Sequence, residues 1–78
     1  MKATHIAECV RINLEGYLSD LGSSEPDRMY AMLLSAVEKP LLEMVMQRTD
    51  HNQSKAAQWL GLNRNTLRKK LLEHKLIE

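Results

Sequence analysis

Residues 52–72 read NQSKAAQWLGLNRNTLRKKLL, a pattern of two short helices joined by a tight turn. Asn52 and Asn63 stand where the two helices would begin, and asparagine is among the best residues for capping a helix N-terminus. Gly61 stands where the first helix must end and the chain reverse, a conformation that costs least without a Cβ. Crossed helices around a glycine turn are typical of the helix-turn-helix, so we predict that motif here.

The residues of this motif separate into an inward and an outward face. We expect small Ala57 to let the helices cross closely, above an inward face made of Ala56, Leu60, Leu62, Leu67 and Leu71. The outward face of the second helix would carry Arg64, Asn65, Arg68 and Lys69. Arginine can bind guanine, and asparagine adenine, through paired hydrogen bonds, whereas lysines, hydroxyls and amides suit phosphates. The pattern therefore predicts a helix that reads the major groove of DNA.

The charge of the chain is unevenly distributed. Its net charge is only +1, yet residues 52–72 hold five basic residues and no acidic one. The charge of this segment is therefore +5, and that of the remainder is −4. Such an asymmetry indicates that the segment binds a polyanion.

Two longer helices are expected before the motif. A helix over about 5–21, capped by Gly22, is predicted by apolar residues that recur every three or four positions, namely Ile6, Val10, Leu14, Tyr17 and Leu21. The sequence Ser24-Glu25-Pro26-Asp27 has the spacing of a capping box and predicts a second helix from there to Arg48 or Thr49. Pro40 would kink this helix, and the alternative is two shorter helices split at Lys39.

The second helix is apolar on nearly every side and must therefore be buried. A chain of 78 residues has little else to cover it, and a single core of that size contributes only about 3–5 kcal/mol. One cysteine cannot form an internal disulfide, and three scattered histidines lack metal-ligand spacing. We therefore predict a homodimer whose core is formed by the same helices of two subunits.

Composition argues against several other classes of protein. The chain has no phenylalanine, two prolines and three glycines, which favours helices over short strands and predicts an all-α fold. It lacks an apolar run of membrane-spanning length and the apolar segment of a secretory signal, which indicates a cytoplasmic protein. No phosphate loop or nucleophile motif is present, so we expect no enzyme, cofactor, metal site or small-molecule substrate.

The sequence from Glu38 to Leu71 resembles the Fis family of nucleoid-associated proteins, on EKPLLEMVMQ at 38–47, NQSKAA at 52–57 and GLNRNTLRKKL at 61–71. The same unit ends many bacterial enhancer-binding activators of the nitrogen-regulation type. The similarity covers nearly the whole chain and is densest over 39–71. It implies four helices per chain, with two long helices in an intertwined homodimer core, a kink at Pro40 and a C-terminal helix-turn-helix over 53–72.

The resemblance also implies which residues contact DNA. The residues that would read bases or reach the groove floor are Asn63, Arg64 and Arg68. The residues that would contact phosphates are Asn52, Ser54, Thr66, Lys69 and Lys70. In such a dimer the two reading helices lie closer than one DNA turn, so the duplex would bend and sequence preference would come largely from deformability at AT-rich centres.

Some positions depart from the family pattern. Leu72 and Glu73 stand where lysines are common, which would weaken flanking DNA contacts. Asp50 stands at a basic position in the turn through which some members contact RNA polymerase, a further partner that the resemblance implies. Only five residues precede Ile6, so we do not expect recombinase stimulation through an N-terminal arm.

These observations predict a single domain over 1–78, with dimerisation helices over about 5–49 and a DNA-binding helix-turn-helix over 52–74. The predicted function is that of a sequence-tolerant DNA-binding and DNA-bending transcriptional regulator of the bacterial nucleoid. The alternative is a protein-protein dimerisation or interaction module with only weak residual DNA binding.

Overall fold

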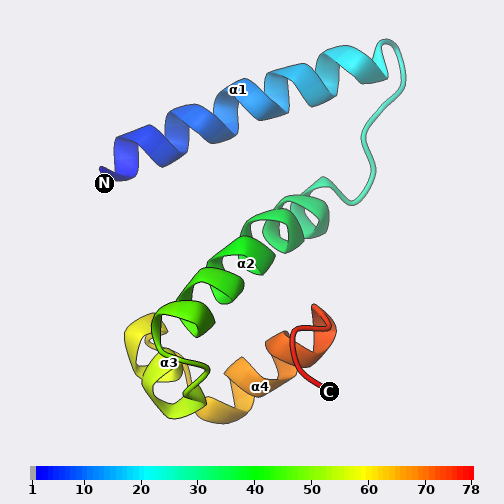
Figure 1. The fold of residues 1–78 in the computed structure, drawn as a ribbon. Coiled ribbons are helices and arrows are strands. Elements are labelled where there is room, and N and C mark those ends of the chain that lie inside the picture. The colour runs from blue at the N-terminus through cyan, green and yellow to red at the C-terminus, as the bar shows by residue number, and fades with distance from the viewer. Residues whose placement is uncertain (1) are drawn as a thin grey trace.

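A computed structural model describes residues 2–78, and in that range the chain forms four helices and no strand. The helices are α1 (Ala3–Leu21), α2 (Met29–Arg48), α3 (Gln53–Leu60) and α4 (Arg64–Glu73). In Figure 1 the two long helices α1 and α2 form an open V joined by a loop, and α3 and α4 fold back against the C-terminal half of α2. The all-α class is confirmed. Over residues 2–78, no helix combines the length and the apolar character that crossing a membrane requires.

The core of the chain lies where α2, α3 and α4 meet. Its buried residues are Leu42 and Met46 from α2, Ala56 and Ala57 from α3, and Leu67 and Leu71 from α4. The inward face predicted for the helix-turn-helix is confirmed, with Leu60 and Leu62 half-buried at its edge. Each fully buried leucine contributes roughly 1.5–3 kcal/mol, so this small cluster fixes α4 against α2.

The C-terminal ends of α2, α3 and α4 share one hydrogen-bond pattern. After each helix, one N–H donates to the carbonyl oxygen three residues back, and the next N–H donates to the carbonyl oxygen five residues back. The longer-range bonds are His51 to Met46 (2.8 Å), Leu62 to Ala57 (2.9 Å) and Leu76 to Leu71 (2.8 Å). This is the Schellman motif, which requires a left-handed residue at the turn. Gly61 supplies it after α3, with a φ of 72°, whereas Asp50 and Lys75 adopt it with side chains.

Within the chain, most of the surface of both long helices is exposed. In α1 no described residue is buried, although the predicted apolar stripe is its more shielded side, with Val10, Leu14, Tyr17 and Leu21 half-buried. In α2 only Leu42 and Met46 are buried. A second row of apolar side chains on α2, here called the α2 stripe, recurs every three or four residues and is 46–79% exposed; its members are Tyr30, Leu34, Val37, Leu41 and Met44.

The capping box predicted at Ser24 is wrong, because α2 begins at Met29, five residues later. The backbone N–H of Ser24 donates to Leu21 O at 3.1 Å and therefore belongs to the turn that ends α1. Pro26 also disfavours helical backbone at the residue before it. The helix starts instead after Arg28, which adopts a left-handed φ of 55° without a side-chain cap.

Pro40 lies inside an unbroken α2, so the alternative of two shorter helices split at Lys39 is wrong. The kink at Pro40 stays a prediction. The first helix begins at Ala3, two residues before the predicted start, and ends at Leu21 as predicted. Gly22 caps it with a φ of 63°, which confirms the predicted cap.

Replacing Lys75 by glycine is expected to stabilise the protein. Lys75 has a φ of 58°, a region in which an L side chain is strained and glycine is not. The free energy of unfolding should rise by about 0.5–1 kcal/mol, measured by urea unfolding at a fixed protein concentration. Lys69→Gly, inside α4, is the matched control and should lose about 1 kcal/mol. A loss in Lys75→Gly would contradict the turn after α4.

Candidate nucleic-acid interface

An open hollow of about 500 Å³ lies between the start of α3 and the first turns of α4. It is lined only by amide and guanidinium side chains, from Gln53, Asn63, Arg64, Asn65 and Arg68. The structure thus brings together all three residues predicted to read bases or the groove floor. Because these groups are rich in donors and no carboxylate lines the hollow, its chemistry suits acceptors such as base edges and phosphate oxygens.

The two predicted N-caps are confirmed, and they fix two of the predicted contact residues in place. Asn52 Oδ1 accepts a hydrogen bond from the Lys55 N–H at 3.1 Å, and Asn63 Oδ1 accepts one from the Asn65 N–H at 2.8 Å. Each cap uses only the side-chain oxygen, so the Nδ2 donors stay available to an outside acceptor. They stand at helix N-termini, where unpaired backbone N–H groups and the helix dipole favour negative charge.

The residues predicted to contact phosphates fall into two groups. The exposed group consists of Asn52, Ser54, Thr66 and Lys69. Lys70 is separate from them, because its ammonium is turned toward α2 and lies 2.9 Å from Glu38 Oε2. The side chain of Lys70 is 32% exposed, so it remains accessible but is already paired.

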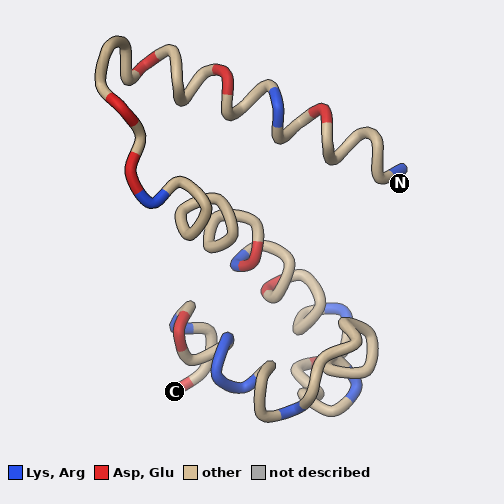
Figure 2. Tube along the Cα trace, turned by 180° about the vertical axis from the view of Figure 1, so that it is seen from behind, with Lys and Arg blue, Asp and Glu red and all other residues tan. Residues whose placement is uncertain are grey.

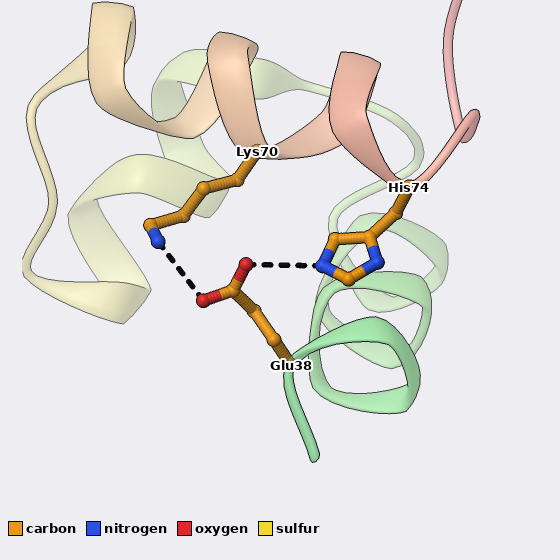
Figure 3. Close-up of polar contacts among 3 residues, drawn as sticks. All are labelled: Glu38, Lys70 and His74. Carbon is orange, nitrogen blue, oxygen red and sulfur yellow. Dashed lines mark hydrogen bonds and ion pairs between the residues drawn. The ribbon is translucent and has the colours of Figure 1, made fainter. Parts of the chain in front are cut away.

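Glu38, Lys70 and His74 form a polar cluster, here called the Glu38 cluster, that joins α2 to α4 and its C-cap (Figure 3). Glu38 Oε2 accepts from Lys70 Nζ, and Glu38 Oε1 lies 3.0 Å from His74 Nε2. Hydrogen bonding to Lys70, and next to His74, lowers the pKa of Glu38 below its ordinary value, and Glu38 in turn raises the pKa of Lys70. The contact therefore stabilises the fold fully at pH values above the ordinary pKa of a glutamate and below that of a lysine. This stabilisation is lost as pH falls through the lowered pKa of Glu38.

The charges follow the predicted asymmetry. In Figure 2 basic residues recur along α3 and α4, whereas acidic residues lie along α1 and on the loop between α1 and α2. The face that carries the hollow is therefore basic without a matching acidic surface on the same two helices, apart from Glu73 at the end of α4.

Three residues of this region were missed by the sequence analysis. Gln53 lines the hollow, and its place directly after the Asn52 cap is a signal that could have identified it. Glu38 and His74 belong to a contact that spans 32 and 36 residues along the chain. A charged residue on a long helix is ordinarily a solvated one, so nothing in the sequence distinguished Glu38.

Comparisons with known proteins agree with this geometry. The family model described as "Bacterial regulatory protein, Fis family" matches residues 33–74. A Fis-like DNA-binding protein of Neisseria meningitidis serogroup A is 57% identical over 72 residues, which are 92% of this chain and 91% of that protein. A Fis-like DNA-binding protein of Ralstonia nicotianae is 49% identical over 99% of this chain and 100% of its own length. DNA-binding protein Fis of Aliivibrio fischeri is 45% identical over 88% of this chain and 70% of that protein.

The cap at Asn63 can be tested by stability alone. Asn63→Ala should lower the free energy of unfolding by about 1 kcal/mol, because it removes the acceptor for the Asn65 N–H. Asn63→Asp keeps an acceptor oxygen and places a negative charge at the helix N-terminus, so stability should be retained. Thermal unfolding measures both. Asn65→Ala, two residues along the chain and without a capping role for its side chain, is the control; equal losses at 63 and 65 would contradict the cap.

Proposed function

This chain is a helix-turn-helix DNA-binding protein of the Fis family, and from that premise we propose that it acts as a homodimer that bends its sites and regulates transcription. The observation that carries the proposal is the hollow between α3 and α4, where Asn63, Arg64 and Arg68 converge between two capped helix N-termini. The proposed role is one of binding and not of catalysis. The proposed location is the nucleoid of a bacterial cytoplasm.

We assign base and groove contacts to Asn63, Arg64 and Arg68. The two arginines are four residues apart on α4, so they project from one side of the helix. Each can form paired hydrogen bonds with guanine, which discriminate against the wrong base by roughly 1–3 kcal/mol. The Nδ2 donor of Asn63 lies at the start of the same helix and can reach the groove floor or the adjacent backbone.

We assign phosphate contacts to Asn52, Ser54, Thr66 and Lys69. All four are exposed, and they cover the first turn of α3 and the outer side of α4, on both sides of the hollow. Phosphate contacts of this kind position a protein on the duplex without selecting its sequence. Lys70 was predicted to join them, and its pairing with Glu38 makes its role a separate question.

The homodimer is supported by the α2 stripe. Five large apolar side chains, each 46–79% exposed, recur on one face of a long helix. Exposing such a row to water is unfavourable, and a second copy of the same helix is the simplest surface that covers it. The absence of any buried residue among those described in α1 agrees with a core completed by another subunit.

A dimer places two α4 helices on one duplex, and their separation determines whether the duplex must bend. The resemblance to the family implies a separation shorter than one DNA turn, and bending then favours sequences that deform easily. We therefore propose weak base consensus with an AT-rich centre. The turn with Asp50 is the surface through which RNA polymerase would be contacted if this chain has that second partner.

A DNA titration tests these assignments. Wild type, Arg64→Ala and Lys69→Ala are titrated at two salt concentrations against duplexes that differ in one contacted base pair or in the central base pairs. Arg64→Ala should lose discrimination at one base pair by about 1–3 kcal/mol. Lys69→Ala should weaken all duplexes alike and make the salt slope shallower by about 1.8, since each phosphate contact contributes about 0.9 and a dimer holds two.

The central base pairs serve as an internal control for bending, because no side chain is assigned to them. Replacing A·T by G·C there should weaken wild type and Lys69→Ala equally. A folded dimer that binds none of these duplexes at low salt would overturn the DNA assignment and favour a protein-interaction module.

The dimer is tested separately by Leu41→Glu. Leu41 is 49% exposed and belongs to the α2 stripe, so a carboxylate there would be desolvated against the second subunit. Sedimentation should show monomer or unfolded chain where wild type is a dimer. Leu72→Glu is the matched control, because Leu72 is 43% exposed but lies on α4, and it should leave the dimer intact. A Leu41→Glu dimer of unchanged affinity would show that the α2 stripe is not the interface.

A further inference from the structure

The Glu38 cluster is the polar contact that ties the DNA-binding motif to the dimerisation helix α2. We propose that Glu38 is a positioning residue for DNA recognition, which holds α4 at a fixed angle to α2, and that Lys70 acts through Glu38 and not by contacting phosphate. This inference rests on the proposed function, because it concerns how the proposed reading helices are placed on a duplex.

The geometry of the cluster gives it a directional effect that the apolar core lacks. Leu67 and Leu71 attach α4 to the core through contacts that constrain distance but are non-directional. The two oxygens of Glu38 are bonded to residues one helical turn apart, Lys70 and His74, at 2.9 and 3.0 Å. Two bonds from one carboxylate to two points along the end of α4 resist rotation of that helix about its contact with α2.

Lys69 and Lys70 differ in the direction in which their side chains leave α4. Successive residues of an α-helix point about 100° apart, so the two neighbouring lysines leave α4 in different directions. Lys69 is exposed, and the structure of residues 2–78 gives it no ion pair, whereas Lys70 is paired across to α2. If Lys70 bound a phosphate while keeping Glu38, it would bring a carboxylate toward that phosphate, which is unfavourable.

In a dimer the angle between α4 and α2 affects how the DNA is bound. Each α4 is attached to its own α2, and both α2 helices belong to the proposed core. A small rotation of α4 on α2 therefore changes the distance between the two hollows and the bend that the duplex must adopt. Disturbing Glu38 should accordingly affect the preference for deformable centres, while the base discrimination by Arg64 is retained.

The test is a double-mutant cycle on the full-length dimer with Glu38→Ala, Lys70→Ala and the double variant, with Lys69→Ala as the matched control. We expect each single variant at the cluster to weaken binding about three- to tenfold, and the double variant to be no weaker than Glu38→Ala, because residues acting through one contact are non-additive and Glu38→Ala already removes the bond to Lys70. Their salt slopes should equal that of wild type, whereas Lys69→Ala has a shallower slope. Glu38→Ala should also reduce the preference for an A·T over a G·C centre and alter the end-to-end distance of a bound duplex measured by fluorescence transfer.

Other outcomes overturn the inference in recognisable ways. If Lys70 contacts phosphate, Lys70→Ala makes the salt slope shallower and Glu38→Ala strengthens binding, because it frees the lysine. If Glu38 has only a structural role, Glu38→Ala lowers stability but leaves the preference between A·T and G·C centres unchanged. Should Glu38→Ala fail to fold, Glu38→Gln keeps the shape without the charge, and it should show the same reduced preference. Failure of wild type to bind any duplex would overturn the proposed function itself, whereas normal wild-type binding with a shallower Lys70→Ala slope overturns only this inference.

Discussion

The burial of Leu67 and Leu71 against Leu42 and Met46 is the contact on which the rest of the structure depends. It is made possible by Ala56 and Ala57, whose small side chains let α3 lie close beneath α4. Once α4 is fixed by this face, the opposite side of the helix must point to solvent. The arginines and asparagines that line the hollow are therefore presented by the packing of a few apolar residues, and no binding partner is required to expose them.

The long helices depend on a different condition. Within the chain, α1 contributes nothing to the described core, and α2 contributes two buried residues in its C-terminal half. A chain with so little buried area is marginal by itself, so folding and assembly of the proposed dimer are coupled. Stability would then depend on protein concentration, and the helix-turn-helix would lose stability when the proposed dimer dissociates.

The helix-turn-helix could be predicted almost completely from sequence because its signals are local. The caps at Asn52 and Asn63 and the left-handed Gly61 are each defined by neighbours within five residues. The start of α2 could not be predicted so well, because the amide of Ser24 was already committed to the turn after Leu21. The contacts of Glu38 could not be predicted for a related reason, because its partners come from α4 and its C-cap, whose position depends on the whole core. The packing of α4 on the core turns Lys70 toward Glu38, whereas its position in the sequence alone had suggested an exposed side chain that contacts phosphate.

The proposed function gives Asn63 two tasks, because its carboxamide oxygen caps α4 while the nitrogen of this exposed side chain is left as a donor for DNA. Under the proposed assignment, removing the whole carboxamide changes helix stability and DNA affinity together, whereas aspartate keeps the capping oxygen and loses only the Nδ2 donor. Arg64 and Arg68 carry no such internal duty among the interactions described for residues 2–78. Divergence of binding preference in descendants of this chain should therefore accumulate at the arginine positions, while the asparagine that starts the helix changes slowly.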